Sequence, residues 1–307
     1  MMALMTTFDA LPPVCALGES PRWDDEAQCL YWCDIAQGML HRLEWPTRRH
    51  AQWRFEAEVA CCALTCRREG EPAGLVLARR DGLFHFKPDT SDCTRLAAPP
   101  YDPAQERFND GCCDAAGRFW VGTLFEPRTA PRAGVYVLSA GTLGARALDG
   151  YTVSNGLAFS PDGRTLYSAD TTAHVIYAHD YDPDRAQAGP RREFARFAPK
   201  RADGSLAGYG GRPDGACVDA QGCYWVAMYE GARVLRLSPA GQVLQELTLP
   251  VQCPTMTCLG GPDLRTLFIT TSRHRRPEEE LASQPLAGRV LHLRVDIPGL
   301  PVARYRP

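Results

Sequence analysis

The chain has 307 residues, of which 45% are hydrophobic and 23% are charged, and its formal net charge at pH 7 is −2. This length accommodates two ordinary domains or one large all-β domain, with enough apolar residues for a core. The near-neutral charge and the lack of a basic patch argue against a nucleic-acid partner and against attraction to a membrane surface.

The chain begins with MMALMTTFDALPP, which has no basic region, no long apolar run and no cleavage motif of a secretory signal. No stretch approaches the ~18 consecutive apolar residues of a membrane span. The sequence contains 13 cysteines, and an odd number without an export signal indicates reduced thiols rather than a disulfide framework. We therefore expect a soluble, cytoplasmic protein whose cysteines are mainly structural.

Pairs of short predicted strands recur along the chain. Each unit has a polar residue, an apolar strand, a turn, and a second strand with an aromatic or apolar pair. In chain order the units begin at Gly18 (GESPRWDDEAQCLYWCDI), Val59 (VACCALTCRREGEPAGLVLARRDGLFHF), Asn109 (NDGCCDAAGRFWVGTL), Asn155 (NGLAFSPDGRTLYSADT), Pro213 (PDGACVDAQGCYWVAMY) and Pro254 (PTMTCLGGPDLRTLFITTS).

The spacing of these units indicates the fold. The reference residues of the second strands are Trp32, Val76, Trp120, Tyr167, Trp225 and Phe268, about 43 to 58 residues apart. This period is close to that of a β-propeller blade. Third strands are expected at 134–138, 174–180, 232–237 and 289–295, and fourth strands at 191–197 and 242–249.

The predicted fold is therefore all-β: a single six-bladed β-propeller domain over residues 1–307, with four-stranded antiparallel blades and no amphipathic helix. The alternative is a set of β-sandwiches, which the internal period disfavours. Two terminal segments compete to complete the last blade, VCALGE at 14–19 and VARYRP at 302–307.

Polar residues recur where the first strands begin. In a propeller these strands line the central channel, so Glu19, Asn109, Asn155 and Asp214 are expected to converge at the axis. Two neighbouring carboxylates repel each other unless a proton or a cation lies between them. Such oxygen donors suit a divalent cation such as calcium, magnesium or manganese. The alternative is a hydrogen-bonded plug of the channel.

Several loops are expected at the same mouth of the channel, because second strands end where first strands begin. They are 125–133, 170–173, 198–212 and 272–287. The two longest would form a lid over a binding pocket. The charged run at 273–280 is equally compatible with a solvated surface loop.

Four motifs resemble the SMP-30/gluconolactonase family, which includes regucalcin: LGESPRW, RFNDGCCDAAGRFWVGTL, VSNGLAFSPDGRTLYSADT and GRPDGACVDAQGCYWVA. The resemblance covers roughly residues 14–295. It implies a six-bladed propeller with one divalent metal ion at its axis (Ca, Mg, Mn, Zn or Fe(II)) and hydrolysis of lactones. It also implies metal ligands at Glu19, Asn155 and Asp214. Substrate contacts are implied at Arg107, Asn109 and Glu126, although the sequence around Glu126, FEPR, departs from the family pattern.

The expected function is that of a carboxylic ester hydrolase that opens sugar (aldono)lactones to aldonic acids. Asp214 is the predicted base that accepts a proton from the attacking water. The sequence contains no G-x-S-x-G motif, so a covalent route is disfavoured. The alternatives are a non-catalytic calcium- or small-ligand-binding propeller and, less favoured, a protein-interaction scaffold. We expect a monomer or weak homo-oligomer.

Overall fold

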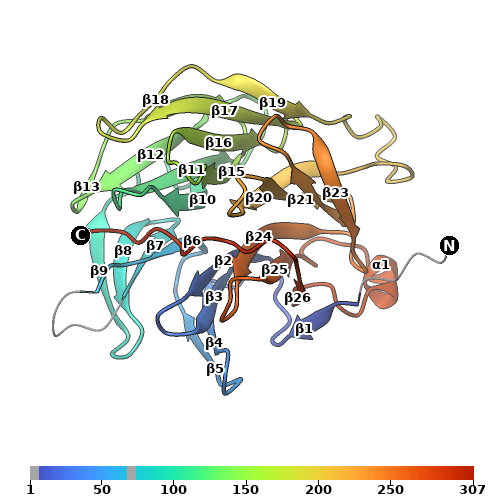
Figure 1. The fold of residues 1–307 in the computed structure, drawn as a ribbon, viewed down its shortest axis with the longest axis horizontal. Helices are drawn as coiled ribbons and strands as arrows, with labels where there is room; N and C mark the ends of the chain where they lie inside the picture. Colours follow the sequence, from blue (N-terminus) through green and yellow to red (C-terminus); the bar gives the residue numbers. More distant parts are fainter. Residues whose placement is uncertain (1–6, 68–73) are drawn as a thin grey trace.

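The computed structural model describes residues 7–67 and 74–307. Two segments lie outside the described residues. They are 1–6, the beginning of the N-terminal segment MMALMTTFDALPP, and 68–73, within the second repeat unit. The described strands form six small antiparallel sheets around one axis (Figure 1). The predicted six-bladed β-propeller is therefore confirmed.

The blades follow one another along the chain. Blades 1 to 3 contain β2 (Gly18–Asp24), β3 (Cys29–Asp34), β4 (Met39–Glu44) and β5 (His50–Arg54); β6 (Val59–Leu64), β7 (Leu75–Arg79), β8 (Gly82–Lys87) and β9 (Asp92–Ala97); and β10 (Glu106–Cys113), β11 (Phe119–Phe125), β12 (Ala133–Ser139), β13 (Thr142–Leu143) and β14 (Leu148–Tyr151). Blades 4 to 6 contain β15 (Ser154–Phe159), β16 (Thr165–Asp170), β17 (Val175–Asp182), β18 (Gln187–Ala188) and β19 (Arg192–Arg196); β20 (Arg212–Val218), β21 (Tyr224–Tyr229), β22 (Arg233–Leu237) and β23 (Val243–Thr248); and β24 (Pro254–Gly260), β25 (Thr266–Thr271), β26 (Val290–Arg294) and β1 (Asp9–Leu11).

The hairpin of blade 4 shows how the sequence determines such a pair. Between β15 and β16 the turn SPDG ends at Gly163, whose φ is +65°. The Gly163 amide donates to the Ser160 carbonyl at 2.8 Å, and the Ser160 amide donates to the Thr165 carbonyl at 2.9 Å. A residue with positive φ at this point favours glycine. The Pro-Asp-Gly sequence therefore predicts the turn correctly.

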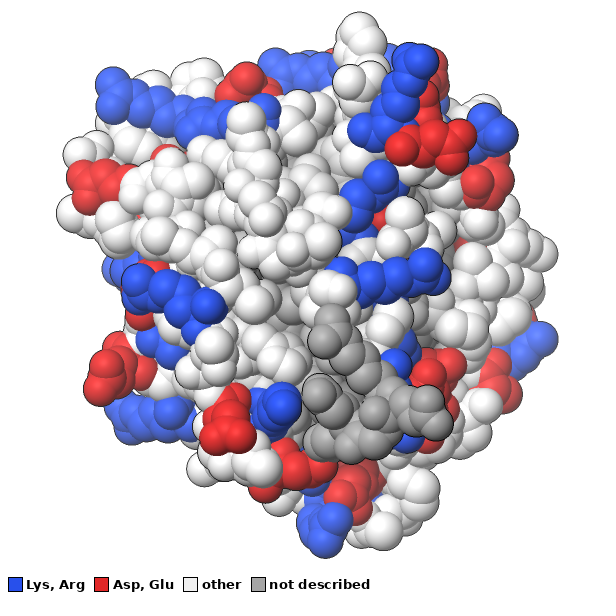
Figure 2. Space-filling model, turned by 90° about the vertical axis from the view of Figure 1, so that its left-hand side faces the viewer, with Lys and Arg blue, Asp and Glu red and all other residues white. Residues whose placement is uncertain are grey.

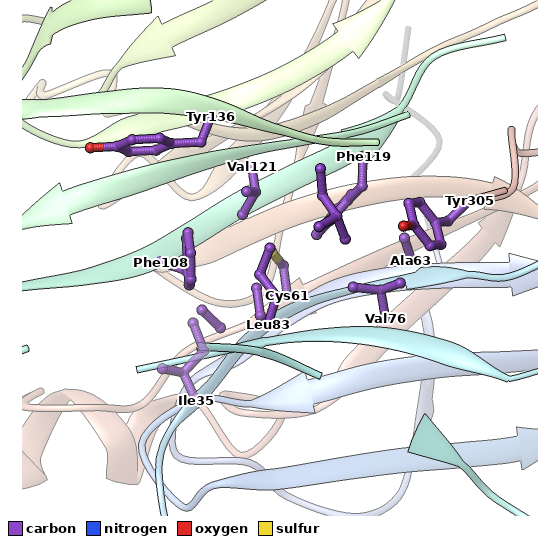
Figure 3. Close-up of a cluster of buried hydrophobic side chains, with 13 residues drawn as sticks. Ile35, Cys61, Ala63, Val76, Leu83, Phe108, Phe119, Val121, Tyr136 and Tyr305 are labelled. Carbon is purple, nitrogen blue, oxygen red and sulfur yellow. The ribbon is translucent and has the colours of Figure 1, made fainter. Parts of the chain in front are cut away.

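The first strands of the six blades are innermost, and each contacts the first strands of the two neighbouring blades (Figure 1). Apolar side chains fill the spaces between blades. Between blades 2 and 3, for example, Val76, Phe108 and Phe119 pack with Tyr305 (Figure 3). Burying one such large side chain contributes roughly 1.5–3 kcal/mol. The ring therefore fixes which first strands are neighbours at the axis.

Segments near both ends of the described chain pair with the ring, but neither of the two predicted terminal segments completes blade 6. The strand that completes blade 6 is β1, Asp9–Leu11, which pairs with β26 and precedes the segment 14–19. The other candidate, 302–307, pairs with blade 2 through the bridge between Thr65 and Tyr305. Figure 1 shows this C-terminal segment crossing the molecule from blade 6.

The described residues contain one feature that the sequence pattern missed, the helix α1 (Glu278–Ser283). It lies in the loop between β25 and β26, and none of its residues is buried. The helix has only six residues, and Leu281 alone packs against an apolar cluster, so no amphipathic pattern indicates it. All 13 cysteines are free thiols, as predicted. No helix among the described residues is long and apolar enough to cross a membrane.

Replacing Tyr305 tests the contribution of the C-terminal segment. Its side chain is fully buried, and its hydroxyl accepts a hydrogen bond from the Gly141 amide at 2.7 Å. Tyr305→Ala should lower the free energy of unfolding by about 3–5 kcal/mol because it leaves a cavity. Urea unfolding measures this change. Leu300→Ala, at an exposed side chain of the same segment, should cost less than about 0.5 kcal/mol. Equal losses in the two variants would contradict this account.

Candidate active site at the propeller axis

All six predicted site residues line one pocket of about 750 Å³ at the axis. They are Glu19 (β2), Arg107 and Asn109 (β10), Glu126 (the loop after β11), Asn155 (β15) and Asp214 (β20). A larger hollow of about 1060 Å³ lies at the outer edge of blade 4, around Arg164 and Asp182, and none of the predicted residues lines it. The axial pocket is therefore the candidate site.

A β-bulge interrupts the pairing of each first strand with its second strand. In four blades the interruption lies beside a predicted site residue, since the register shifts after Glu19, Phe108, Asn155 and Pro213. Bulges re-aim side chains and are frequent next to functional sites. The repeated bulge thus gives four separate blades the same local means of directing a polar side chain into the pocket.

A directional chain of hydrogen bonds connects four of these residues. Arg107 Nη1 donates to Asn109 Oδ1 at 2.9 Å, and Asn109 Nδ2 donates to Asn155 Oδ1 at 2.7 Å. Asn155 Nδ2 then donates to Asp214 Oδ1 at 2.5 Å. The chain begins at a guanidinium, which only donates, and ends at a carboxylate, which accepts when ionised. This order orients both amides.

The carboxylates of Glu19 and Asp214, at the floor of the pocket, have too little positive charge around them to favour their ionised forms. Burial raises the pKa of Glu19 well above its usual range, and the negative charges of Asp214 and Asp110 raise it further. Burial also raises the pKa of Asp214 to about 8, although Arg212 opposes this shift. Burial and like charge both disfavour the ionised form. An additional cation is what would allow both groups to be ionised at neutral pH.

The residues fit a hard divalent cation by their chemistry. Glu19, Asn155 and Asp214 supply oxygen donors, which calcium, magnesium and manganese prefer. Among the described residues no three His, Cys, Asp or Glu side chains form a metal cluster, because one member of this set is an amide. The amide of Asn155 faces Asp214 with its nitrogen, so it would have to turn over to bind a cation through its oxygen.

Glu126 is held at the pocket wall by a residue that sequence reasoning missed. Arg80 donates from Nη2 to Glu126 Oε1 at 2.8 Å and from Nη1 to Oε2 at 3.1 Å. The same guanidinium also pairs with Glu58. Arg107 lies 3.9 Å from Glu126. Glu126 is therefore positioned by two arginines, and the local departure FEPR does not remove it from the pocket.

Two further charged groups support the site. Below the pocket, Arg22 donates to the carbonyls of Cys62 and Gly111 and lies 3.9 Å from Asp110. Arg22 lies in the motif SPRW, three residues after Glu19, and Asp110 lies in the motif FNDG, directly after Asn109. Their closeness to these predicted site residues was the signal that could have identified them.

The second group is centred on Glu230 at the rim of the pocket. Its buried carboxylate pairs with Lys200 at 3.0 Å, Arg212 at 3.2 Å and Arg276 at 2.8 Å. These cations come from the two long loops and from the start of β20, so one carboxylate holds both loops. No sequence pattern indicated this group, because its members are separated by up to 76 positions (276 minus 200).

The predicted rim loops reach the pocket to different extents. Residues of 125–133, 170–173 and 272–287 line it, whereas Arg212 alone does so within 198–212. In the charged run 273–280, His274, Arg275 and Arg276 line the pocket, and the following residues belong to the unburied helix α1. One part of this run therefore borders the pocket and the other part is a solvated surface segment, while the lid stays a prediction.

Comparison with known proteins agrees with the geometry. The model of the SMP-30/gluconolactonase/LRE-like region matches residues 17–273. A 6-deoxy-6-sulfogluconolactonase from Pseudomonas putida is 44% identical over 286 residues, 92% of each chain. A regucalcin from Oryctolagus cuniculus is 31% identical over 303 residues, 96% of each chain. The fold of a calcium-binding regucalcin from Agrobacterium tumefaciens superposes with a TM-score of 0.89, at 23% identity and over 100% of both chains. The chain therefore belongs to the SMP-30/gluconolactonase/LRE-like family, as its motifs predicted.

Proposed function

We propose that this protein is a metal-dependent sugar lactonase, a carboxylic ester hydrolase that opens aldonolactones to aldonic acids. The observation that carries the proposal is the group formed by Glu19, Asn155 and Asp214 at the floor of one axial pocket. The name of the Pseudomonas putida relative supports lactone hydrolysis and specifies a sulfonated gluconolactone. A sulfonated sugar lactone is thus one candidate substrate.

Glu19, Asn155 and Asp214 would hold the cation, with calcium, magnesium or manganese favoured over zinc or iron by the oxygen donors. When bound, a divalent cation stabilises negative charge on a carbonyl oxygen and lowers the pKa of a nearby water. Stabilisation of this kind commonly contributes on the order of 3 kcal/mol to the reaction barrier, about 100-fold in rate.

Asp214 is the proposed general base. Hydrolysis of a lactone requires water to attack the ring carbonyl and to lose a proton. Asp214 borders the pocket, and its Oδ1 is held by the Asn155 amide. Its pKa is about 8 without added positive charge, so a neighbouring cation would keep it ionised and able to accept that proton at neutral pH.

Arg107, Asn109 and Glu126 are the proposed substrate contacts. Arg107 and Asn109 are coupled to each other and, through Asn155, to Asp214. Glu126 is fixed by Arg80. Fixed donors and acceptors of this kind hold the hydroxyl groups of a sugar ring and orient its carbonyl, which contributes to the rate by positioning.

Removing the carboxylate of Asp214 tests the proposed base. Asp214→Ala should lower kcat/KM for an aldonolactone at least ~100-fold at saturating metal, because both proton acceptance and charge balance are lost. A pH-indicator assay with a panel of five- and six-carbon lactones measures this value. Asp184→Asn, at an exposed aspartate, is the matched control and should retain normal turnover. Wild-type turnover in Asp214→Ala would rule out the assigned role.

Metal dependence is tested on protein stripped with a chelator. Such protein should open no lactone until calcium, magnesium, manganese or another divalent ion is added back. Glu19→Gln, which keeps the side-chain size and removes the charge, should weaken metal binding about ten-fold or more by calorimetry. Glu56→Gln, at an exposed glutamate, should not.

Activity that survives chelation would refute the metal requirement. Metal binding without hydrolysis of any lactone in the panel would instead support the non-catalytic binding propeller.

A further inference from the structure

The axial pocket contains positive charge that has no partner. Five arginines line it: Arg107, Arg128, Arg212, Arg275 and Arg276. Three of them are paired, since Arg107 faces Glu126, Arg212 binds Glu230, and Arg276 binds both Glu230 and Glu280. For Arg128 and Arg275, no carboxylate among the described residues lies within ion-pair distance. These two guanidinium groups are therefore free to meet a ligand.

Three of the five carboxylates that line the pocket are paired with cationic side chains. Glu58 and Glu126 share Arg80, and Glu230 has three cationic partners. The remaining two, Glu19 and Asp214, lie on the floor and form the proposed cation site. The pocket therefore offers Arg128 and Arg275 no carboxylate outside the proposed cation site.

Arg128 is held at a defined place on the rim. It occupies a turn position with a φ of +54°, and its amide donates to the Phe125 carbonyl at 3.0 Å. The Phe125 amide donates in turn to the carbonyl of Thr152, in the connection from blade 3 to blade 4, at 3.1 Å. A positive φ is uncommon for a residue other than glycine. The turn that presents Arg128 is thus fixed between two blades.

Arg275 occupies a similar turn on another blade. Its φ is +56°, and the turn closes with the Arg276 amide donating to the Arg273 carbonyl at 3.3 Å. The Arg273 amide binds the Ala16 carbonyl at 2.9 Å, and Arg276 is held by Glu230. Blades 1 and 5 therefore anchor the turn on both sides, and Arg275 stands at its tip.

Arg128 lies in the loop after β11 and Arg275 in the loop after β25, and both side chains line the axial pocket. On the part of the flank that Figure 2 shows and the structure describes, acidic and basic side chains are interspersed. Arg128 and Arg275 are distinguished from these surface side chains by lining one shared pocket.

We propose that Arg128 and Arg275 recognise a tetrahedral oxyanion, a sulfonate or a phosphate, carried by the lactone at the end of the molecule away from its carbonyl. The planar guanidinium offers paired donors that match such an anion. The assignment of the lactone ring rests on the proposed function, whereas recognition of the anion by these two residues does not require turnover. Recognition of this anionic group by Arg128 and Arg275 makes the pocket selective for charged sugar lactones over neutral ones.

The test compares three substrates: δ-gluconolactone and the same lactone with a 6-sulfonate or a 6-phosphate. The wild type should show a kcat/KM at least ten-fold higher for a charged lactone than for the neutral one. Arg128→Gln and Arg275→Gln should each lower this ratio about ten-fold, the effect of losing one hydrogen bond to a charged group. The two charged lactones distinguish sulfonate from phosphate. Added salt should also lower the ratio.

Matched controls remove an arginine from the same two loops without touching the pocket lining. Arg132→Gln and Arg273→Gln should keep the wild-type ratio within about two-fold, because surface charges away from the site have small effects. Calorimetry with the ring-opened 6-sulfonate and 6-phosphate aldonates supplies a readout that needs no hydrolysis. Binding should weaken about ten-fold in the Arg128 and Arg275 variants and not in the controls.

The outcomes separate this inference from the proposed function. Hydrolysis of charged and neutral lactones with equal efficiency, or equal losses in pocket and control variants, would overturn the inference and leave the lactonase in place. If no lactone is opened but the charged aldonates bind through Arg128 and Arg275, the anion site is supported and the proposed function fails. If no arginine variant changes binding of either aldonate, the inference is wrong.

Discussion

The repulsion between two carboxylates, Glu19 and Asp214, is the constraint on which the site depends. Burial raises the pKa of both groups, and the negative charge of Asp214 raises that of Glu19 further. A protein tolerates such a pair only with a proton or a cation between them, or with compensating cations nearby. The surrounding network follows from this constraint, because Asn155 donates to Asp214 and arginines surround the pocket. The proposed cation site thus has its origin in unfavourable charge.

The propeller makes this arrangement possible at positions far apart in the chain. Glu19 and Asp214 are separated by 195 positions (214 minus 19), yet the closed ring of first strands brings them to one pocket. Each blade contributes the same element, a first strand with a bulge near its start. The apolar packing between blades supplies the rigidity, and the loops at the mouth supply Arg128, Glu230 and Arg275. The scaffold and the residues proposed to determine specificity therefore lie in different parts of the blades.

The sequence predicted the features that repeat. The hairpins, the six-fold period and the convergence of Glu19, Asn109, Asn155 and Asp214 are visible because each recurs in equivalent segments. Features that occur once were missed. The closing strand β1 has three residues, and α1 has six, of which Leu281 alone packs against an apolar cluster. The pairs of Glu230 with Lys200 and Arg276 depend on how two long loops fold back, which no local pattern encodes.

The most direct measurement of the central claim is the anomalous diffraction of crystals grown with manganese. The account predicts one strong peak at the axis, about 2.0–2.6 Å from oxygen atoms of Glu19, Asn155 and Asp214, the range of hard divalent cations. It also predicts that the Asn155 amide turns its oxygen toward that peak. An axis without anomalous density under saturating metal, with the Asn155 nitrogen still bonded to Asp214, would contradict the account.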